Sequence, residues 1–403
     1  MKPDTDIIVL GGGMAGACAA TLLARQSRTV TLVEARLPAH APSVESVDLR
    51  VSAISRATQR ILTACGAWEL IAAGPICSYE RMVVWDEAGR AGDQGSIEFD
   101  CAEVGQPNLG HIVENRRLQW ALLEQARAAG ARIVEARVSG LSAGGGSMTV
   151  ELENGERLGA ALAVAADGAD SPARKMMQID VREAEVRQRA VVCHIRTAQP
   201  HRHTAWQRFL STGPIALLPL HDGRCSIVWT TTPDHARELT AQSDGEFCRA
   251  VEAASDSVLG RVEAVSTRAD FPLRSVHAEC YALERFALVG DAAHAVHPLA
   301  GQGVNLGFLD CAALAQTLGD ADADPGELRL LRQYERWRKG ENLLMLSALD
   351  GLNGLFSNHN PVLGFLRRNG LSLVDRVRPL KSLFMRRALG LAGDLPQVAL
   401  LDA

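Results

Sequence analysis

The chain has 403 residues, of which 47% are hydrophobic and 22% charged, so it is ordinary for a globular protein and long enough for two or three domains. Its net charge of −5 argues against a nucleic-acid partner, and its nine cysteines include no C-x-x-C pair, so we expect reduced thiols, no metal site and no disulfide framework. No signal peptide is apparent and no apolar run approaches the ~18–20 residues that span a bilayer, which predicts a soluble or peripheral cytoplasmic protein.

Residues 6–25 begin with a short buried strand, continue through a glycine-rich turn and end in an Ala- and Leu-rich helix. In such a turn Gly11 permits the tight bend, Gly13 leaves room for a pyrophosphate, and Gly16 lets the helix pack closely on the strand. The helix N-terminus offers N–H groups to phosphates, and Glu34, after a second strand, is placed to accept hydrogen bonds from a ribose. The pattern predicts a dinucleotide-binding unit without distinguishing FAD from NAD.

Two later strands also end in motifs that suit ligand binding. The strand over 158–166 ends in Asp167-Gly168, and the strand over 285–289 ends in Gly290-Asp291. Glycines within 301–305 then open a helix. Taken singly, Asp167-Gly168 is typical of a turn and Gly290-Asp291 of a helix cap. Because the carboxyl ends of parallel strands meet at one edge of a sheet, the combination indicates a shared binding site.

The middle of the chain predicts an inserted, mostly antiparallel sheet. Its strands are expected at 190–196, 204–210, 215–220 and 225–231, followed by a polar helical stretch over 233–254 and further strands up to 273. The candidate walls of a substrate pocket are Leu217, Pro219, Trp229, Phe271 and Pro272. For any one of them, ordinary core packing is the alternative.

The C-terminal part predicts a long helix over 328–356, with a possible break at its glycines, and then a basic stretch over 361–390. That stretch contains seven Arg or Lys residues and a single acid, Asp375, with apolar residues interleaved. A basic amphipathic segment of this kind can dock on an anionic membrane or on a partner protein, and plain packing is the alternative.

The three strand-end motifs, in this order, resemble the flavin-dependent aromatic hydroxylases of the para-hydroxybenzoate hydroxylase type. The resemblance covers nearly the whole chain and is closest to the ubiquinone-biosynthesis hydroxylases (the UbiH/UbiF/VisC group), within which the VisC (UbiI) 2-polyprenylphenol hydroxylase type looks most similar. The stretches that carry the likeness are Leu49–Ile54, Val84–Asp86, Leu109–Asn115, Cys225–Trp229 and His294–Phe308.

The resemblance implies one non-covalent FAD, with NAD(P)H as a transient reductant. It assigns Gly11, Gly13, Gly16 and Glu34 to the ADP half, Arg50 to the FAD phosphates (a surface charge is the alternative), Asp167 to FAD and NAD(P)H, Gly290 and Asp291 to the ribityl chain, and Pro298, Gly301, Gly303, Val304 and Asn305 to the flavin ring. The implied fold is an α/β FAD-binding Rossmann-like domain with an inserted substrate-binding sheet and a C-terminal helical segment. The implied domains are residues 1–179 with 281–340, residues 180–280, and residues 341–403.

The activity implied by the resemblance is hydroxylation of the ring of a polyprenyl phenol with O2, through a flavin hydroperoxide. The flavin carries the chemistry, so no catalytic residue is assigned; His297 could help to deprotonate the phenol, and a structural histidine is the alternative reading. A bilayer-dissolved substrate suggests peripheral docking on the inner face of the membrane or contact with a biosynthetic complex. The rival functions are a flavin monooxygenase for another phenol or an alkene, and a non-catalytic FAD-binding assembly subunit.

Overall fold

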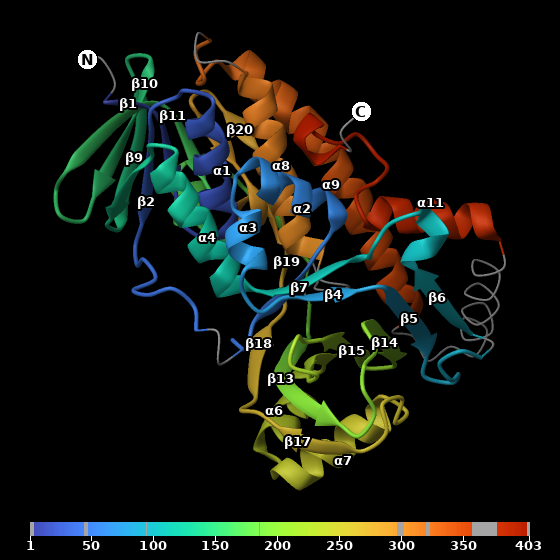
Figure 1. Cartoon of the computed structure of the whole chain (residues 1–403). Helices are drawn as coiled ribbons and strands as arrows, with labels where there is room; N and C mark the ends of the chain where they lie inside the picture. The colour runs from blue at the N-terminus through green and yellow to red at the C-terminus, as the bar shows by residue number, and fades with distance from the viewer. Residues whose placement is uncertain are drawn as a thin grey trace.

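Two lobes, each built on a large sheet, make up the molecule (Figure 1). The computed structural model describes residues 4–43, 47–93, 95–184, 186–295, 302–319, 323–356 and 377–400. The three-stranded sheet of β3 (Val51–Ile54), β7 (Gly110–Glu114) and β4 (Cys77–Tyr79) lies between the lobes.

The first sheet has the order β20-β21-β11-β1-β2-β8. Its parallel strands are β21 (Phe286–Leu288), β11 (Arg157–Ala165), β1 (Thr5–Leu10), β2 (Val30–Glu34) and β8 (Arg132–Glu135). The antiparallel strands β20 (Ala282–Leu283), β10 (Ser147–Leu152) and β9 (Val138–Gly144) extend it. The central strands β1 and β11 are nearly continuous apolar runs, as is typical of strands buried on both faces of a parallel sheet.

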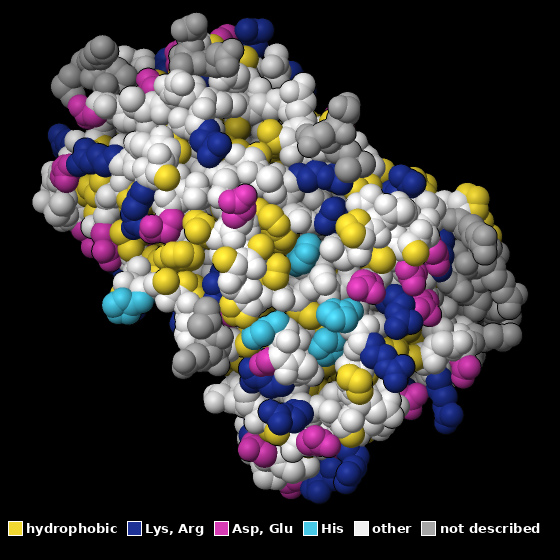
Figure 2. All heavy atoms as spheres, viewed as in Figure 1, with side chains coloured by type: hydrophobic (Ala, Val, Ile, Leu, Met, Phe, Trp, Pro, Cys, Tyr) yellow, Lys and Arg dark blue, Asp and Glu magenta, His cyan; other side chains and the backbone are white. Residues whose placement is uncertain are grey.

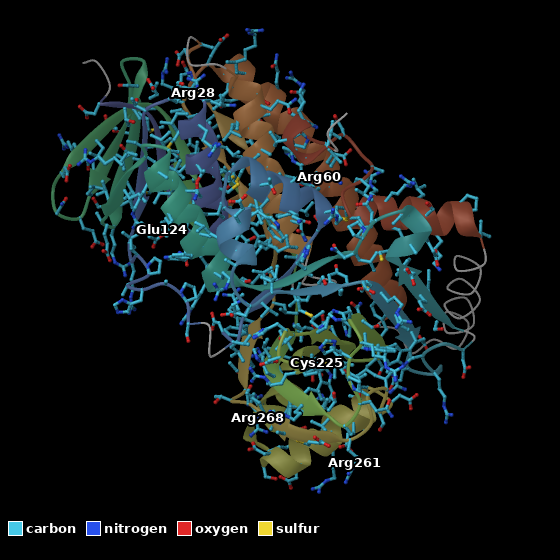
Figure 3. All side chains as sticks on the ribbon, viewed as in Figure 1. Arg28, Arg60, Glu124, Cys225, Arg261 and Arg268 are labelled. Atoms are coloured by element: carbon cyan, nitrogen blue, oxygen red, sulfur yellow. The ribbon has the colours of Figure 1, made fainter. Side chains whose placement is uncertain are left out.

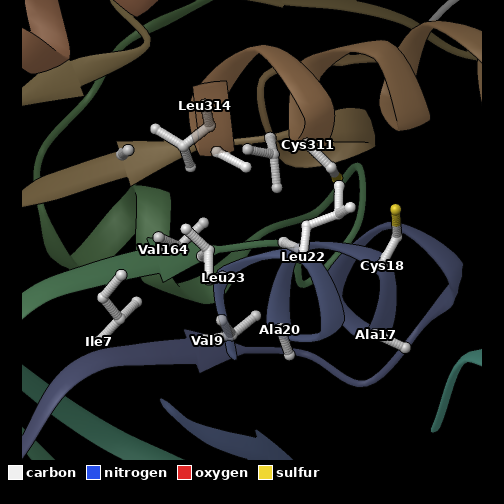
Figure 4. Packing of buried hydrophobic residues seen from close by; sticks show 14 of the residues in the cluster. Ile7, Val9, Ala17, Cys18, Ala20, Leu22, Leu23, Val164, Cys311 and Leu314 are labelled. Atoms are coloured by element: carbon white, nitrogen blue, oxygen red, sulfur yellow. The ribbon is translucent and has the colours of Figure 1, made fainter. Parts of the chain in front are cut away.

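The core of this lobe lies between the sheet and two long helices, α1 (Met14–Arg25) and α8 (Gln302–Leu318). Figure 4 shows Val9 of β1 and Val164 of β11 facing Leu23 of α1 and Leu314 of α8. All four side chains are fully buried, and each such burial contributes about 1.5–3 kcal/mol. This packing fixes the strand ends that carry the predicted motifs.

The remaining helices of this lobe surround that core. They are α2 (Arg56–Ala64), α3 (Trp68–Ala72), α4 (Asn115–Ala128), α5 (Pro172–Met176), α9 (Leu328–Phe356) and α11 (Arg378–Ala388), with short 3-10 turns η1 (Cys101–Val104), η2 (Gly290–Ala292) and η4 (Gln397–Ala399). Helix α9 continues through Gly351 and Gly354, where the sequence allowed a break. None of the helices within the described ranges is long and apolar enough to cross a membrane.

The second sheet has the order β17-β13-β16-β15-β14-β5-β6, with β18 also paired to β13. Its strands are β13 (Arg189–Thr197), β14 (Thr204–Leu210), β15 (Gly213–Pro219), β16 (Cys225–Thr231), β17 (Val262–Val265), β18 (Ala269–Pro272), β5 (Arg81–Asp86) and β6 (Ser96–Asp100). The last two come from the first part of the chain, so the expected boundary at residue 180 does not separate the sheets. Strand β5 pairs in parallel with β14 and thereby covers what would be an open edge.

One face of the second sheet is covered by two helices, α6 (Pro233–Ala241) and α7 (Asp244–Ala254), rather than by one helical stretch. The break lies at Ser243, whose side chain caps α7 in a capping box with Glu246. A small sheet of β12 (Val181–Ala184), β19 (Ser275–Ala278) and β22 (His294–Ala295) links this region back to the first lobe.

The C-terminal segment packs against the first lobe and β6. Lys381 pairs with Glu103 at 2.8 Å, and Arg387 pairs with Glu341 of α9 at 2.9 Å. Arg60 of α2, which is labelled in Figure 3, donates to the carbonyl of Ala399 at 2.9 Å. Two basic residues of the stretch, Lys381 and Arg387, thus form ion pairs within the protein, while residues 367, 368 and 376 lie outside the described residues.

Stability should fall as the pH drops below about 6.5, because His111 of β7 is buried next to Trp68, 4.9 Å between ring centroids. Burial, with a smaller contribution from the charge of Arg56, lowers the pKa of His111 to about 4. As the pH falls, the unfolded chain therefore takes up a proton at His111 before the folded chain does. The stabilisation that neutral His111 gives the folded state is complete above about pH 6.5 and is lost as the pH falls towards 4.

The variant His111→Phe, which keeps the aromatic contact with Trp68, should flatten this dependence in urea unfolding followed from pH 7 to pH 4. An unchanged slope would contradict this account of His111.

Candidate active site

A cavity of about 590 Å³ lies between the two lobes. One wall comes from the segments that follow β1, β11 and β21, from β3, from β22 and from the start of α8: Gly13–Ala15, Ala166, Gly168, Ala169, Gly290, Asp291, Arg50–Ala53, Ala295, Gly303, Val304 and Gly307. The opposite wall comes mainly from the second sheet and the end of β18: Ala190, Val192, Ala205–Gln207, Pro214, Ala216, Leu218, Ser226, Val228, Thr230 and Phe271–Arg274. A ligand held on the first wall therefore faces the second sheet.

The turn between β1 and α1 has the glycines that close packing requires. Gly11 has φ +101°, and a Cβ on it would lie 2.6 Å from the carbonyl oxygen of Ala166. A Cβ on Gly16 would lie 1.8 Å from the carbonyl oxygen of Gly11. A Cβ on Gly13 would meet no atom within 4 Å, and Gly13 lines the cavity. The backbone is thus tight against the sheet on one side and open to the cavity on the other.

Side chains fasten this turn from two directions. Glu34, at the end of β2, accepts hydrogen bonds from the N–H groups of Gly12 and Arg36. Gln119 of α4 donates to the carbonyl of Gly12 at 2.8 Å, a contact that the sequence analysis missed. Helix α1 begins after Gly13 without a side-chain cap, so its first N–H groups remain available to an anionic ligand.

The carboxylate of Asp167 is engaged in hydrogen bonds within the protein. It accepts hydrogen bonds from the Ser171 hydroxyl and from the Ala173 N–H at 2.9 Å, which caps the short helix α5. Burial raises its pKa, while these hydrogen bonds oppose the rise. It is the neighbours Gly168 and Ala169 that line the cavity.

The loop after β21 brings Gly290 and Asp291 to the cavity. Gly290 has φ +60° and lies against α1 and α8, where a Cβ would be 3.1 Å from the Cβ of Ala15. The exposed surface of Asp291 faces the cavity. Enclosure by the walls raises the pKa of Asp291, and the charges of His294 and Arg50 oppose that rise.

A buried polar network holds this loop from behind. Asp310 of α8 accepts hydrogen bonds from the Gly290 N–H at 3.2 Å and from His294 at 2.5 Å. Its other oxygen accepts from Arg338 at 2.8 Å and from Asn342 at 3.1 Å, both on α9. Burial alone would raise the pKa of Asp310, but the charges of His294 and Arg338 and their hydrogen bonds lower it to about 2. The carboxylate therefore stays ionised and ties the loop to two helices.

Asn305 also acts inside the protein instead of lining the cavity. Its amide donates to the Ala53 carbonyl at 2.9 Å and accepts from the Ser55 N–H at 3.0 Å and the Thr58 hydroxyl at 2.8 Å. The start of α8 is thereby joined to β3 and α2, while Gly303 and Val304 lie in the cavity wall. The predicted residues His297, Pro298 and Gly301 lie outside the described residues.

The predicted substrate residues divide into two groups. Phe271 and Pro272 line the cavity, and the Phe271 ring centroid lies 5.5 Å from the guanidinium carbon of Arg50. Leu217 and Trp229 instead lie on the opposite face of the sheet, in the core beneath α6 and α7, and Pro219 is buried outside the cavity wall. Because side chains alternate along a strand, the positions next to them face the cavity.

Sequence reasoning missed several polar residues of the cavity wall. Among them are Ser52, Asn115, Gln207, Ser226 and Thr230. The Ser52 hydroxyl donates to the Asn115 side chain at 2.7 Å, so these two form a pair beside Arg50. For Ser226 and Thr230 on β16, the signal in the sequence was a polar residue alternating with buried apolar ones, which marks the face away from a core; Gln207, between Trp206 and Arg208, gave no such signal.

These features define a two-lobed flavoprotein of the oxidoreductase class, and the residues present fit an FAD molecule: an open glycine cradle, an uncapped helix N-terminus, and a cavity that continues to a second lobe. The chain belongs to the FAD-binding-domain family, whose model matches residues 4–342.

Named relatives and a solved structure agree with this assignment. The chain is 36% identical to the ubiquinone hydroxylase UbiL of Rhodospirillum rubrum, over 96% of this chain and 89% of the relative. It is also 36% identical to the 3-demethoxyubiquinol 3-hydroxylase of Escherichia coli, over 96% and 99% of the two chains. The crystal structure of p-nitrophenol 4-monooxygenase PnpA from Pseudomonas putida DLL-E4 shares the fold, with TM-score 0.77, 17% identity, and coverage of 96% and 99%. The chain is thus a member of a family of FAD-dependent hydroxylases.

Proposed function

We propose that this protein is an FAD-dependent monooxygenase that hydroxylates the aromatic ring of a polyprenyl phenol in ubiquinone biosynthesis, with NAD(P)H as reductant and O2 as the oxygen source. The observation that carries the proposal is the continuous cavity, which runs from the β1–α1 turn to the second sheet. Of the two named relatives, one is a ubiquinone hydroxylase and the other a 3-demethoxyubiquinol 3-hydroxylase, as their names state.

Bound FAD supplies the electron transfer and the activation of oxygen, and the protein supplies binding, orientation and exclusion of water. We assign the adenosine and phosphate half to Gly11, Gly13, Gly16, Glu34 and Arg50, and the ribityl and flavin half to Gly290, Asp291, Gly303 and Val304. Asp167 and Asn305 are positioning residues for the loops beside that site, because their side chains bond within the protein.

The second sheet offers the substrate a wall of small apolar residues, such as Ala190, Ala216 and Val228. Because these side chains are small, they leave room for a ring, and because they are apolar, they exclude water from the reacting face. Phe271 and Pro272 close one side of this space. The position of the ring carbon that is hydroxylated, including the carbon five expected from the VisC type, stays a prediction.

Product analysis tests this proposal. The purified holoenzyme is incubated with NADH or NADPH, O2 and ortho-geranylphenol, and products are separated by mass spectrometry. We expect a product that is hydroxylated on the ring, heavier by one oxygen atom, and that carries 18O when the reaction runs under 18O2. A product that carries the new oxygen on the geranyl double bonds would favour an alkene monooxygenase, and FAD that NAD(P)H cannot reduce would favour a non-catalytic assembly subunit.

We also propose that the protein docks peripherally on the inner face of the membrane through the middle of α9 and the neighbouring α11. The Glu341–Arg387 ion pair holds the two helices together, and Leu343, Leu344 and Leu383 near it are 43–56% exposed. Figure 2 shows Lys, Arg, Asp and Glu interspersed over one face of the molecule, so no broad basic face is visible there. We therefore propose that apolar side chains make most of the contact with the membrane and that basic side chains contribute little.

Flotation with phosphatidylglycerol vesicles tests this docking. The double variant Leu344→Glu/Leu383→Glu should lose most of the vesicle-bound fraction, because each change adds an anion where an apolar side chain would enter the interface. The matched control is Leu328→Glu, at the first residue of α9, where the native side chain is 38% exposed. This variant should float like the native protein. Equal flotation of all three proteins would remove the membrane proposal.

A further inference from the structure

The cavity-facing side of the second sheet is mostly apolar, but three of its side chains are polar. Strand alternation places Ser226 and Thr230 of β16 and Gln207 of β14 on this side, away from the core beneath α6 and α7. Across the strands, Val228 is paired with Ala216 and with Val192, which makes a small apolar row beside Ser226. The wall is thus an apolar platform with a polar border.

All three border residues are buried, and Ser226 is the most deeply buried of them. Its residue exposure is 0%, and its hydroxyl oxygen has no hydrogen-bond partner among the described residues. Of the cavity-lining residues, Trp206 also has a buried unpartnered atom, but its side chain packs against the core on the other face of the sheet. A buried hydroxyl without a partner is costly, so few remain in native proteins without a reason.

The position next to Ser226 strengthens the case. In the register of the sheet Ser226 lies opposite His194 of β13 on one side and Leu218 of β15 on the other. His194 is 2% exposed, and its Nε2 also has no partner among the described residues. Burial and the charge of Arg224 lower the pKa of His194, so its ring is neutral near pH 7. Two unsatisfied polar groups therefore stand side by side at the border of an apolar platform.

We propose that Ser226 is a specificity-determining residue whose hydroxyl forms a hydrogen bond with an oxygen substituent on the substrate ring, while the ring lies over Val228 and Ala216. A serine hydroxyl can donate and accept, so it suits a phenol oxygen in either role. His194 lies beside Ser226 in the register of the sheet and outside the cavity wall. This inference rests on the proposed function and identifies how an oxygen-substituted ring is distinguished from a plain apolar one.

The test compares two ligands on the holoenzyme, followed by the change in flavin absorbance on titration. Ortho-geranylphenol carries the ring oxygen, and geranylbenzene lacks it. Ser226→Ala should weaken binding of ortho-geranylphenol about tenfold, the value of one neutral hydrogen bond, and leave geranylbenzene binding within about twofold. Ser226→Thr, which keeps the hydroxyl and suits a strand, should restore most of the loss.

Stability gives an independent readout. Because Ser226 has no partner in the protein itself, Ser226→Ala should unfold at the same temperature as the native protein or higher, with the same FAD content. Equal weakening of both ligands, unchanged binding of both, or a lowered unfolding temperature would overturn the role of Ser226 while leaving the proposed function intact. A native enzyme that neither binds nor hydroxylates ortho-geranylphenol would overturn the proposed function itself, and with it this inference.

Discussion

Replacing Asp310 with Ala should destabilise the protein by roughly 3–5 kcal/mol, because it leaves a buried cation without its partner. Arg338 is 1% exposed and donates to Asp310, and His294, which is also fully buried, shares the same carboxylate. The Gly290 N–H would lose its acceptor as well, so the loop that carries Asp291 to the cavity would lose its anchor. We expect a protein that unfolds at much lower urea concentration and retains little FAD.

The matched control is Asp234→Ala, which removes the partner of Arg237 on the surface of α6. Both side chains are at least 75% exposed, so the change should cost less than about 1 kcal/mol. The pH profile separates the two further. Since the pKa of Asp310 in the folded protein is about 2, below its usual 3.8, its contribution is complete above about pH 4 and lost as the pH falls towards 2. A variant Asp310→Ala as stable as Asp234→Ala would refute the anchoring role.

Gly16→Ala should abolish FAD binding and destabilise the fold by several kcal/mol, because the new Cβ would lie 1.8 Å from the carbonyl oxygen of Gly11. That oxygen belongs to the backbone of the turn, so α1 must move away from β1. Gly13→Ala provides the contrast, since its Cβ meets no atom within 4 Å and its φ of −67° suits alanine. We expect Gly13→Ala to fold like the native protein and to bind FAD at least tenfold more weakly, because the methyl group occupies space beside the phosphates.

Urea unfolding and FAD titration of the two variants, side by side, measure these effects. The combination of normal stability with weak FAD binding in Gly13→Ala is the informative result, because a defect in folding cannot produce it. Native FAD affinity in Gly13→Ala would show that the pyrophosphate does not approach this turn.

Local signals in the sequence were sufficient to predict the first lobe. The strand, turn and helix around Gly11, Gly13 and Gly16 are specified by residues adjacent in the chain, and so is the loop at Gly290-Asp291. The repeated strand-to-turn pattern indicated that these strand ends share one edge of an α/β sheet, but the order of the strands and the strands β8, β9 and β10 were not predicted. The four central strands of the second sheet were also placed within a few residues of their observed bounds.

The features that the sequence could not predict depend on contacts between distant parts of the chain. Leu217 and Trp229 were chosen for the cavity because they are large and apolar, but α6 and α7 cover their face, and alternation gives the cavity to smaller neighbours. No local feature of the sequence indicated which face of the second sheet α6 and α7 would cover. Similarly, the pairing of β5 with β14 joins residues more than a hundred positions apart, and the hydrogen bonds of Asp167 and Asn305 depend on partners brought in by folding.

The absorbance spectrum of the purified protein tests the central claim most directly. If the β1–α1 turn, the Gly290-Asp291 loop and the start of α8 together bind FAD, the protein should be yellow, with flavin bands near 375 and 450 nm that disappear when NAD(P)H is added under anaerobic conditions. One flavin released per chain on denaturation is the expected stoichiometry. A native protein that is colourless, and that stays so after incubation with FAD, would contradict the account.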